Sequence, residues 1–472
     1  MTAGDPAAIP DTPLGAPPAR RVVMKFGGTS VRDADAIRRL SEIVGQEDRR
    51  RLVVVSALAG VTDQLVELAA QATTGENLAL GKTIDAIRTR HLELVADLVS
   101  SAAQHDVISA IDDSCLQLKT MVHALAVLRE LSPRSTDAVT SVGETMSSRL
   151  VAASLDSEGV VAEWVDARRV LVTDGSYGRA QPDMGATTVR VRNTVGPLLD
   201  RGVTPVLGGF VGATPEGVVT TLGRGGSDYS AAIFGAVLDA SEIQIWTDVD
   251  GMLTADPRIV PDARLVPSLT FGEASELAYF GAKVLHPAAI QPAVIKNIPV
   301  RIVNARRPDG RGTRITAHSE REDSAIAAIA SKRSLTVIEI SSARMLMAYG
   351  FLKRLFEVFD RFETAVDVVT TSEVDVSVTI DDPRHLDALV AELSAFADVS
   401  TEPEMALLCV VGERLHDDPT LFAEIVGALG GTACRMVSQS ASRRNLTFVL
   451  RERELPLAMS TLHDHFFGHV EA

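Results

Sequence analysis

The chain has 472 residues, 46% of them apolar and 23% charged, a composition typical of a globular protein with several domains. Its 62 acidic and 46 basic residues give a net charge of −16. This balance argues against a main role on nucleic acid or on an anionic membrane, because proteins with such roles usually carry a basic stripe. A few local cations can still hold an anionic substrate.

Cysteine usage and the N-terminus indicate the compartment. The three cysteines lie far apart and form no CxxC pair, as is typical of a reducing environment. No apolar run is long enough to cross a bilayer. Residues 1–20 are rich in Pro and Ala and lack the basic start of a secretory signal, so they predict a disordered tail. We therefore expect a cytoplasmic protein without a membrane segment.

The region over residues 21–310 alternates between strands and helices. Short, mainly apolar runs predict buried strands of a parallel sheet. They cover residues 22–26, 52–55, 203–207, 242–246 and 300–303. Helical patterns between them indicate an α/β/α sandwich with a largely parallel sheet.

A helical insertion is predicted at about residues 63–132. Apolar residues recur with a period of 3.6 along residues 84–98 and again along residues 118–128. His91 lies on the first stripe, and no neighbour could share a metal with it. We therefore expect His91 to be a packed core histidine.

The C-terminal third is predicted to repeat one small module. A strand at 335–340, a helix at 351–359 and strands at 366–369 and 374–380 are followed by the same order at 405–411, 421–429, 434–437 and 446–450. The offset of about 70 residues suits two β-α-β-β-α-β modules, at residues 331–402 and 403–472. Residues 311–330 would be a linker, in which residues 326–330 could add a strand that interleaves the modules.

The motif KFGGTS at residues 25–30 follows the first predicted strand and opens a helix. Two glycines let the backbone approach an anion, and a helix start offers free N–H groups. Lys25 precedes the glycines, so the spacing differs from that of a Walker loop. A phosphate site and a plain strand-to-helix turn are equally compatible with this motif alone.

A second glycine-rich motif, GRGGSDYS at residues 223–230, precedes an apolar helix at 231–238. The dinucleotide pattern fails because Asp228 stands at its last glycine position. Arg224 suits a carboxylate, which it can bind bidentately. The alternative is a turn capped by Ser227 or Asp228. Two such loops in one α/β domain favour an enzyme that handles phosphate.

Further polar segments follow predicted strands, where α/β sheets bind ligands. They are WTDVDG at 246–251 with TADPR at 254–258, GAKVLHP at 281–287, VVVSA at 53–57 with GVTD at 60–63, and SVGE at 141–144. An acidic turn is a competing interpretation for the first of these, and a solvated lysine for the second. Taken singly, the last two favour helix caps over site residues. No HExxH, GxSxG or HRD/DFG pattern occurs, which disfavours metalloprotease, serine hydrolase and protein kinase functions.

Together these motifs resemble those of the aspartate kinases of the amino-acid kinase family, in particular the single-function, lysine-regulated branch with two ACT modules. The resemblance runs from about Val22 to the C-terminus. It implies transfer of the γ-phosphoryl group of MgATP to the side-chain carboxylate of L-aspartate, the first step toward lysine, threonine and methionine. Mg²⁺ would arrive on the nucleotide rather than on a protein metal site. It further implies a homodimer or larger homo-oligomer formed through the ACT modules.

The resemblance also implies roles for individual residues. The nucleotide site would comprise Lys25, Gly27, Gly28, Thr247, Asp248, Arg258 and Lys283. The aspartate site would comprise Ser56, Thr62, Glu144, Phe210, Arg224 and Ser227. The catalytic residues would be Lys25, Asp228 and Lys283, with Asp228 orienting the lysines. Many relatives have a nucleotide-contacting tyrosine where this chain has Leu253.

An amino-acid effector site is implied as well, for lysine first and for threonine as the alternative. It would comprise Met345, Gly350, Phe351, Leu352, Val366, Asp367, Thr371, Ser372 and Glu373. Two positions that are often serine in lysine-sensitive relatives are Ala348 and Ala365. Each lost hydroxyl would weaken lysine binding by about 0.5–1.5 kcal/mol.

Three alternatives remain at this stage. A kinase for glutamate or acetylglutamate is disfavoured because those relatives lack paired ACT modules. A catalytically silent amino-acid sensor is disfavoured because Lys25, Arg224 and Asp228 are all present. The kinase half of a bifunctional aspartokinase–homoserine dehydrogenase is disfavoured because no nicotinamide fingerprint follows the second module.

Overall fold

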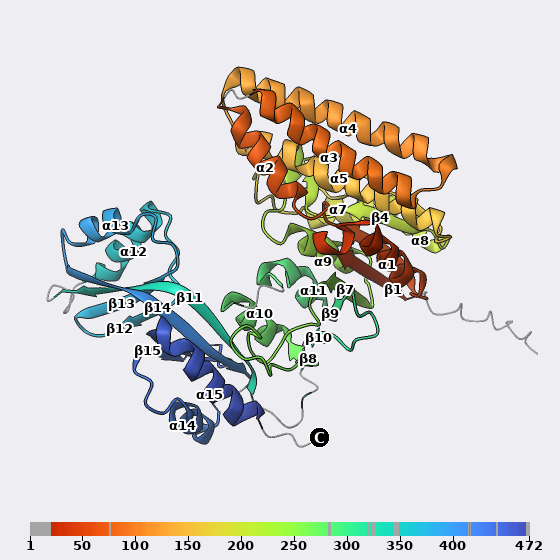
Figure 1. The fold of residues 1–472 in the computed structure, drawn as a ribbon. Coiled ribbons are helices and arrows are strands. Elements are labelled where there is room, and N and C mark those ends of the chain that lie inside the picture. The colour runs from red at the N-terminus through yellow and green to blue at the C-terminus, as the bar shows by residue number, and fades with distance from the viewer. Residues whose placement is uncertain are drawn as a thin grey trace, which may run out of the picture.

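The computed structural model describes residues 20–74, 77–281, 285–318, 321, 326–342, 349–413, 415, 417–439 and 442–468. The chain forms two large sheets, and in each of them strands that are far apart in the sequence pair side by side (Figure 1). The first sheet carries most of the predicted site residues, and the second is formed by the C-terminal third.

The first sheet has eight strands in the order β3-β4-β2-β1-β7-β9-β10-β8. Their bounds are β1 Arg21–Phe26, β2 Arg50–Val55, β3 Ala162–Trp164, β4 Thr204–Gly208, β7 Glu242–Thr247, β8 Ser268–Thr270, β9 Val300–Asn304 and β10 Thr313–Thr316. Neighbouring strands pair in parallel except β9 with β10. The predicted buried strands and the largely parallel sheet are thus confirmed.

Helices cover both faces of this sheet, as an unbroken apolar strand requires. On β1, Val22, Met24 and Phe26 enter the core formed with the helices α1 to α5. Val23 enters the opposite core, which contains the helices α7 to α11. Alternation along the strand therefore places Lys25 on the same side as Val23. The helices are α1 Ala34–Gly45, α2 Val61–Ala72, α3 Asn77–Leu98, α4 Ser101–Leu128, α5 Pro133–Ser157, α6 Ala167–Val170, α7 Met184–Thr194, α8 Gly196–Asp200, α9 Gly226–Val237, α10 Phe271–Tyr279 and α11 Gln291–Lys296.

The predicted helical insertion is present as α2, α3 and α4, which stack above α5 at the far end of the molecule (Figure 1). His91 on α3 is fully buried, and its Nδ1 lies 2.7 Å from the Ile87 carbonyl oxygen. Burial lowers the pKa of His91 to about 4, so the ring is neutral at pH 7. The prediction of a core histidine is confirmed.

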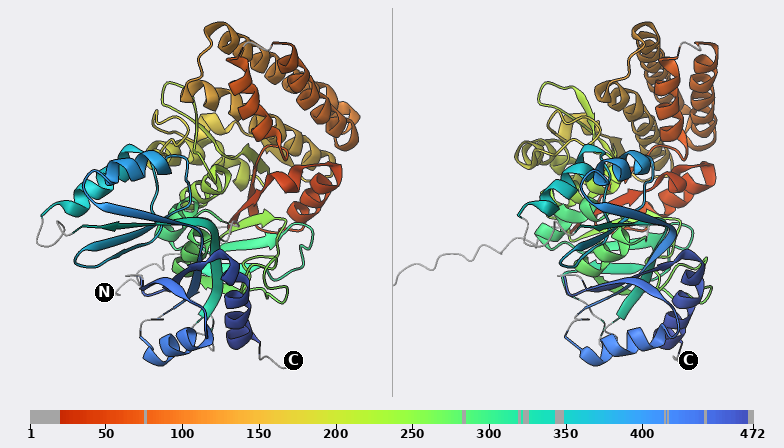
Figure 2. Two further views of the ribbon diagram at one scale, coloured as in Figure 1. Left: turned by 60° about the vertical axis from the view of Figure 1, so that its left-hand side comes forward. Right: turned by 90° about the vertical axis from the view of Figure 1, so that its left-hand side faces the viewer.

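The second sheet has six antiparallel strands in the order β12-β13-β11-β14-β16-β15. The strands are β11 Ile326–Ser341, β12 Val369–Thr371, β13 Asp375–Ile380, β14 Asp398–Gly412, β15 Cys434–Gln439 and β16 Asn445–Arg451. The helices α12 Phe351–Arg361 and α13 Leu386–Leu393 pack on one half of it, and α14 Pro419–Ala428 and α15 Leu455–Phe467 pack on the other (Figure 2).

Two long strands, β11 and β14, run through both halves of this sheet. The predicted boundaries at 330/331 and 402/403 fall inside these strands, so the two halves share one continuous sheet. The division into two modules remains a prediction. The strand expected at 366–369 is wrong in position, because β12 begins at Val369. Upstream of it, the Val368 N–H bonds to the Thr379 hydroxyl, which interrupts the regular ladder.

Helix α10 connects the two sheets. Glu276 on α10 accepts hydrogen bonds from Ser442 at 2.7 Å and from Asn445 at 2.6 Å. A small two-stranded sheet of β5 Val211–Ala213 and β6 Val219–Thr221 lies beside the first sheet and leads into the second glycine-rich motif. Among the described helices, none is both long and apolar enough to cross a membrane.

Candidate active site

The predicted site residues gather where four parallel strands end. The strand register aligns Phe26 with Val55 and with Trp246, and Val55 with Gly208. The segments that follow these strands therefore meet at one edge of the sheet. This carboxyl edge is where α/β sheets bind ligands.

Lys25 and Asp228 form an ion pair at this edge. The Lys25 Nζ lies 2.7 Å from the Asp228 Oδ1, and the two side chains are only 11% and 13% exposed. Lys25 comes from β1 and Asp228 from the first turn of α9. The interpretation of Asp228 or Ser227 as a side-chain cap of this helix is wrong, because the N-cap is Gly225 and no side chain caps it.

Two glycines allow the backbone segments to approach closely here. A Cβ on Gly28 would lie 3.1 Å from the Ala57 carbonyl oxygen, and one on Gly223 would lie 2.7 Å from the Gly178 carbonyl oxygen. Gly223 also has a φ of +78°, which favours glycine. Both glycine-rich motifs are therefore tight turns that bring backbone to the site.

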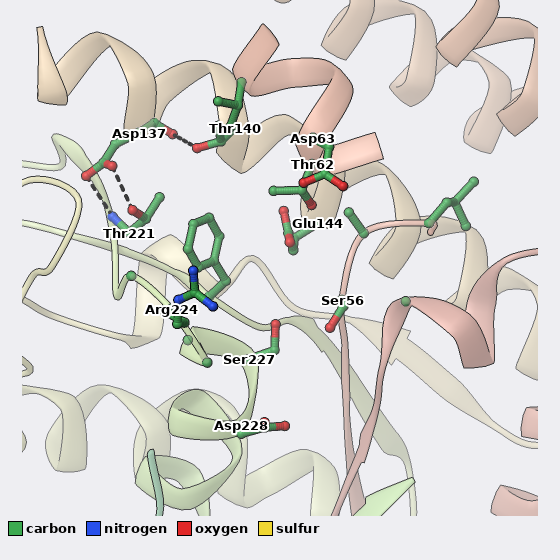
Figure 3. A pocket seen from close by; sticks show the side chains of 18 of the residues that line it. Ser56, Thr62, Asp63, Asp137, Thr140, Glu144, Thr221, Arg224, Ser227 and Asp228 are labelled. Atoms are coloured by element: carbon green, nitrogen blue, oxygen red, sulfur yellow. Dashed lines mark hydrogen bonds between the residues drawn. The ribbon is translucent and has the colours of Figure 1, made fainter. Parts of the chain in front are cut away.

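A cavity of about 570 Å³ opens between these segments. Eight residues that line it match the predicted aspartate and catalytic residues, and the six that are labelled in Figure 3 come from four segments of the chain. They are Ser56, Thr62, Glu144, Arg224, Ser227 and Asp228. Lys25, Gly28 and Phe210 also line the cavity. Phe210 has a φ of +66°, an uncommon conformation for a residue with a side chain.

Glu144 is the buried acid of this cavity. It lies in the middle of α5, so the interpretation of this residue as a helix cap is wrong. Its side chain is buried, and its Oε2 has no hydrogen-bond partner among the described residues. Burial raises the pKa of Glu144 to about 8. An ammonium group placed beside it would supply the missing partner.

Asp137 is a buried wall residue that the sequence reasoning missed. Its carboxylate accepts hydrogen bonds from the Gly178 N–H, the Thr221 N–H and the Thr221 hydroxyl (Figure 3). Thr140 and Asp63 also line the cavity without having been predicted. Asp137, Thr140 and Glu144 are spaced as residues on one face of a helix. Predicting a helix through SVGE would therefore have pointed to Asp137 and Thr140 as neighbours of Glu144.

The remaining predicted nucleotide residues lie apart from this cavity or outside the described residues. Thr247 ends β7, and Asp248 is exposed just after it. Arg258 is exposed and pairs with Asp256 at 2.7 Å. Leu253 pairs with Leu265 in an isolated bridge. Lys283 lies outside the described residues. Among the described residues, no group of three His, Cys, Asp or Glu side chains is arranged to hold a metal ion.

The predicted effector residues flank the second sheet around α12 and β12. Met345 and Ala348 lie outside the described residues. Gly350 and Phe351 begin α12, Leu352 follows them, and Thr371 ends β12. The Asp367 carboxylate is held by Lys332, whose Nζ lies 2.8 Å and 2.9 Å from its oxygens, and by the Tyr279 hydroxyl at 3.4 Å. Tyr279 is the last residue of α10, so this contact joins the two sheets.

Comparison with known proteins places this geometry in a family. The model of the amino acid kinase family matches residues 20–304, and an ACT domain model matches residues 408–466. Lysine-sensitive aspartokinase 3 of Escherichia coli is 37% identical over 94% of this chain and 99% of its own. The chloroplastic aspartokinase 2 of Arabidopsis thaliana is 34% identical over 94% of this chain and 84% of its own.

Solved structures agree with the sequence relatives. The crystal structure of E. coli aspartokinase III in complex with lysine and aspartate has a TM-score of 0.82, at 37% identity, and covers 94% of this chain and 99% of its own. The complex of the same enzyme with aspartate and ADP has a TM-score of 0.81, at 36% identity and 94% coverage of this chain. The chain therefore belongs to the amino acid kinase family and, within it, to the aspartokinases that carry ACT domains.

Proposed function

We propose that the chain uses MgATP to phosphorylate the side-chain carboxylate of L-aspartate and so forms 4-phospho-L-aspartate. One observation carries this proposal: Arg224, Glu144 and the Lys25–Asp228 pair all line the same cavity. A dicarboxylic amino acid needs a cation for its α-carboxylate, an acid for its ammonium and hydroxyl donors for its side chain. The cavity offers a cation, an acid and hydroxyl donors.

The substrate would be held by residues of complementary charge. Arg224 would bind the α-carboxylate, for which a guanidinium is geometrically suited. Glu144 would take the ammonium, together with the Phe210 backbone, and Ser227 would line the same end. Ser56 and Thr62 would donate their hydroxyls to the reacting carboxylate, since they lie on the side of the cavity away from Arg224 (Figure 3).

The chemistry follows from charge and position. The aspartate side chain is already ionised at pH 7, so its oxygen needs no general base to attack the γ-phosphorus. The protein must bring two anions together and neutralise the transferring group. Lys25 would supply positive charge there, oriented by Asp228. The Gly27 N–H donates to the Trp246 carbonyl at 3.1 Å, so the turn at Gly27 and Gly28 would meet phosphate oxygens through the Gly28 N–H. Mg²⁺ bound to the nucleotide would neutralise further phosphate charge.

The nucleotide would extend from Gly27 along the end of β7. Thr247 and Asp248 lie at that strand end, and Arg258 would leave Asp256 for a phosphate. Lys283 completes the proposed set of cations. Leucine at position 253 would replace the aromatic nucleotide contact by an apolar one.

Regulation is proposed to act through the second sheet. An amino-acid effector, lysine in the first place and threonine as the alternative, would bind around Gly350, Asp367 and Ser372 in a homo-oligomer of the chain. The contact of Tyr279 with Asp367 supports this route, because it links the effector region to α10, the helix that precedes Lys283 in the sequence. A cytoplasmic setting fits the three free cysteines, because thiols stay reduced in that compartment.

One assay tests the reaction and its regulation. Purified protein is incubated with MgATP and hydroxylamine, with aspartate, glutamate or acetylglutamate as acceptor, and the acyl hydroxamate is measured. Of the three acceptors, we expect only aspartate to yield hydroxamate, and we expect lysine to reduce the amount formed. Turnover of glutamate in preference to aspartate would refute the substrate, and a flat response to lysine would refute the lysine effector.

A further inference from the structure

We propose that a second cavity, between α4 and α5, is a binding site for a free α-amino acid with an apolar side chain. This cavity has a volume of about 420 Å³ and shares no lining residue with the aspartate cavity. It lies within the catalytic half of the chain, far in sequence from the ACT-type sheet. Charged residues line one end of it, and most of its apolar lining residues lie at the other.

The cavity lies on the back of the helix that carries the aspartate site. Ser141, Thr145 and Arg149 recur every four residues along α5 and line the second cavity. Thr140 and Glu144 lie on the neighbouring stripe of the same helix and line the aspartate cavity. Helical periodicity thus gives α5 two functional faces. A ligand on one face contacts the element that presents Glu144 on the other.

Arg149 lies at the charged end and forms no ion pair with any residue that the structure describes. Its guanidinium carbon lies 3.6 Å from the centre of the Trp164 ring, which covers one face of the group. Its Nε is buried and has no hydrogen-bond partner among the described residues. Arg168, in contrast, is bound bidentately by Asp166 at 2.8 and 2.7 Å. A buried N–H donor without a partner is costly, and a carboxylate bound to the Arg149 guanidinium would offer it an acceptor.

An acid and an apolar surface complete the site. Burial lowers the pKa of Arg149, and the charge of Asp166 and then that of Asp113 oppose this shift. Asp113, on α4, also lines the cavity. The antiparallel helices α4 and α5 are joined by the short turn at 129–132. Met121 and Ala138 therefore lie nearer to that turn than Asp113 and Arg149 do. Val142 and Val219 line the cavity as well. The gradient runs from the opposite charges of Arg149 and Asp113 to an end lined by these apolar residues together with Gln117 and Ser141.

This gradient defines the ligand by its chemistry. A carboxylate would bind Arg149, an ammonium would bind Asp113, and an uncharged side chain would fill the apolar end. A polyanion such as a nucleotide is disfavoured because Asp113 and Asp106 line the cavity. A purely apolar molecule would leave the Arg149 edge unsatisfied. Leucine has all three parts at a suitable size.

Calorimetric titration of the full chain tests the site without using kinase activity. Three probes of one shape are compared: L-leucine, 4-methylpentanoate without the ammonium, and 3-methylbutylamine without the carboxylate. We expect leucine to bind most tightly and the amine most weakly. Arg149→Met should weaken leucine binding at least about ten-fold, because a charge-assisted hydrogen bond is lost. The matched control Arg134→Met, at an exposed arginine of the same helix, should leave leucine binding unchanged.

A second variant keeps the test valid if Arg149→Met fails to fold. Ala138→Leu adds volume to the apolar end without changing charge, and it should block leucine while kinase turnover persists. Absence of leucine binding to the wild-type chain up to its solubility limit would overturn the proposal. So would leucine binding that both Arg149→Met and Ala138→Leu leave unchanged, because the bound leucine would then lie elsewhere.

Discussion

Asp137 and Thr221 stand 84 positions apart in the chain, yet the Thr221 hydroxyl and N–H donate to the two oxygens of the Asp137 carboxylate at 2.7 and 2.9 Å. The Gly178 N–H donates to the same carboxylate at 2.9 Å. One buried acid thus ties α5 to the end of β6 and to the turn at Gly178. Arg224 follows β6 by three residues, so its position depends on this anchor.

Asp137→Asn is expected to loosen the anchor, because its amide nitrogen would meet N–H donors instead of accepting from them. We expect kcat/KM for aspartate to fall about ten- to a hundred-fold, mainly through a higher KM, as one or two buried hydrogen bonds are lost. The KM for ATP should change little. Steady-state kinetics with each substrate varied in turn measures the split. Asp183→Asn, which alters a helix cap outside the cavity, is the control, and an unchanged aspartate KM in Asp137→Asn would contradict the anchor.

The buried Lys25–Asp228 pair leads to a prediction that separates stability from catalysis. Lys25→Met or Asp228→Asn should abolish turnover while circular dichroism shows a folded chain. Each single change leaves a partner without its interaction, and for Lys25→Met this is expected to reduce the free energy of unfolding by about 3–5 kcal/mol. The double variant should recover part of that stability but none of the turnover. Urea unfolding and a coupled kinase assay measure the two effects, and near-wild-type kcat in either single variant would refute the proposed role.

Glu144 is expected to make aspartate binding depend on pH. Because burial raises its pKa to about 8, the carboxyl is mostly neutral below that pH in the free protein. Binding of an ammonium requires the charged form, so the KM for aspartate should rise as the pH falls from about 8 to 6, by at most about ten-fold per pH unit. Glu144→Gln should have a high KM that is flat over this range. A wild-type KM that is also flat would argue against an ammonium at Glu144.

Arg224→Lys tests whether a bidentate carboxylate contact is needed. A lysine keeps the charge but loses the planar pair of donors, so we expect the KM for aspartate to rise about ten-fold with little change in the KM for ATP. Arg179→Lys, at an exposed arginine of the adjoining turn, is the matched control. Equal kinetics for the two variants would place the α-carboxylate elsewhere.

Local signals were enough to predict much of the fold. Mainly apolar runs such as residues 22–26 and 242–246 became β1 and β7, because a strand buried on both faces is rich in apolar residues. The glycines of KFGGTS and GRGGSDYS predicted tight turns at strand ends, which the close contacts at Gly28 and Gly223 explain. The C-terminal strand at 366–369 was misplaced, because Asp367 and Val368 both bond to Thr379, partly through its hydroxyl, and the regular ladder begins only at Val369.

The sequence by itself determined the family, through motifs whose residues lie close together in the chain, and it named Lys25, Arg224, Glu144 and Asp228 as site residues. Only the tertiary structure decided that Lys25 meets Asp228 across 2.7 Å and that Asp137 holds Thr221. These contacts join segments many residues apart, and no periodicity or spacing encodes which of them meet. Parallel strand pairing brings them to one sheet edge, and the surrounding burial then determines the pKa of Glu144 and leaves Arg149 unpaired among the described residues.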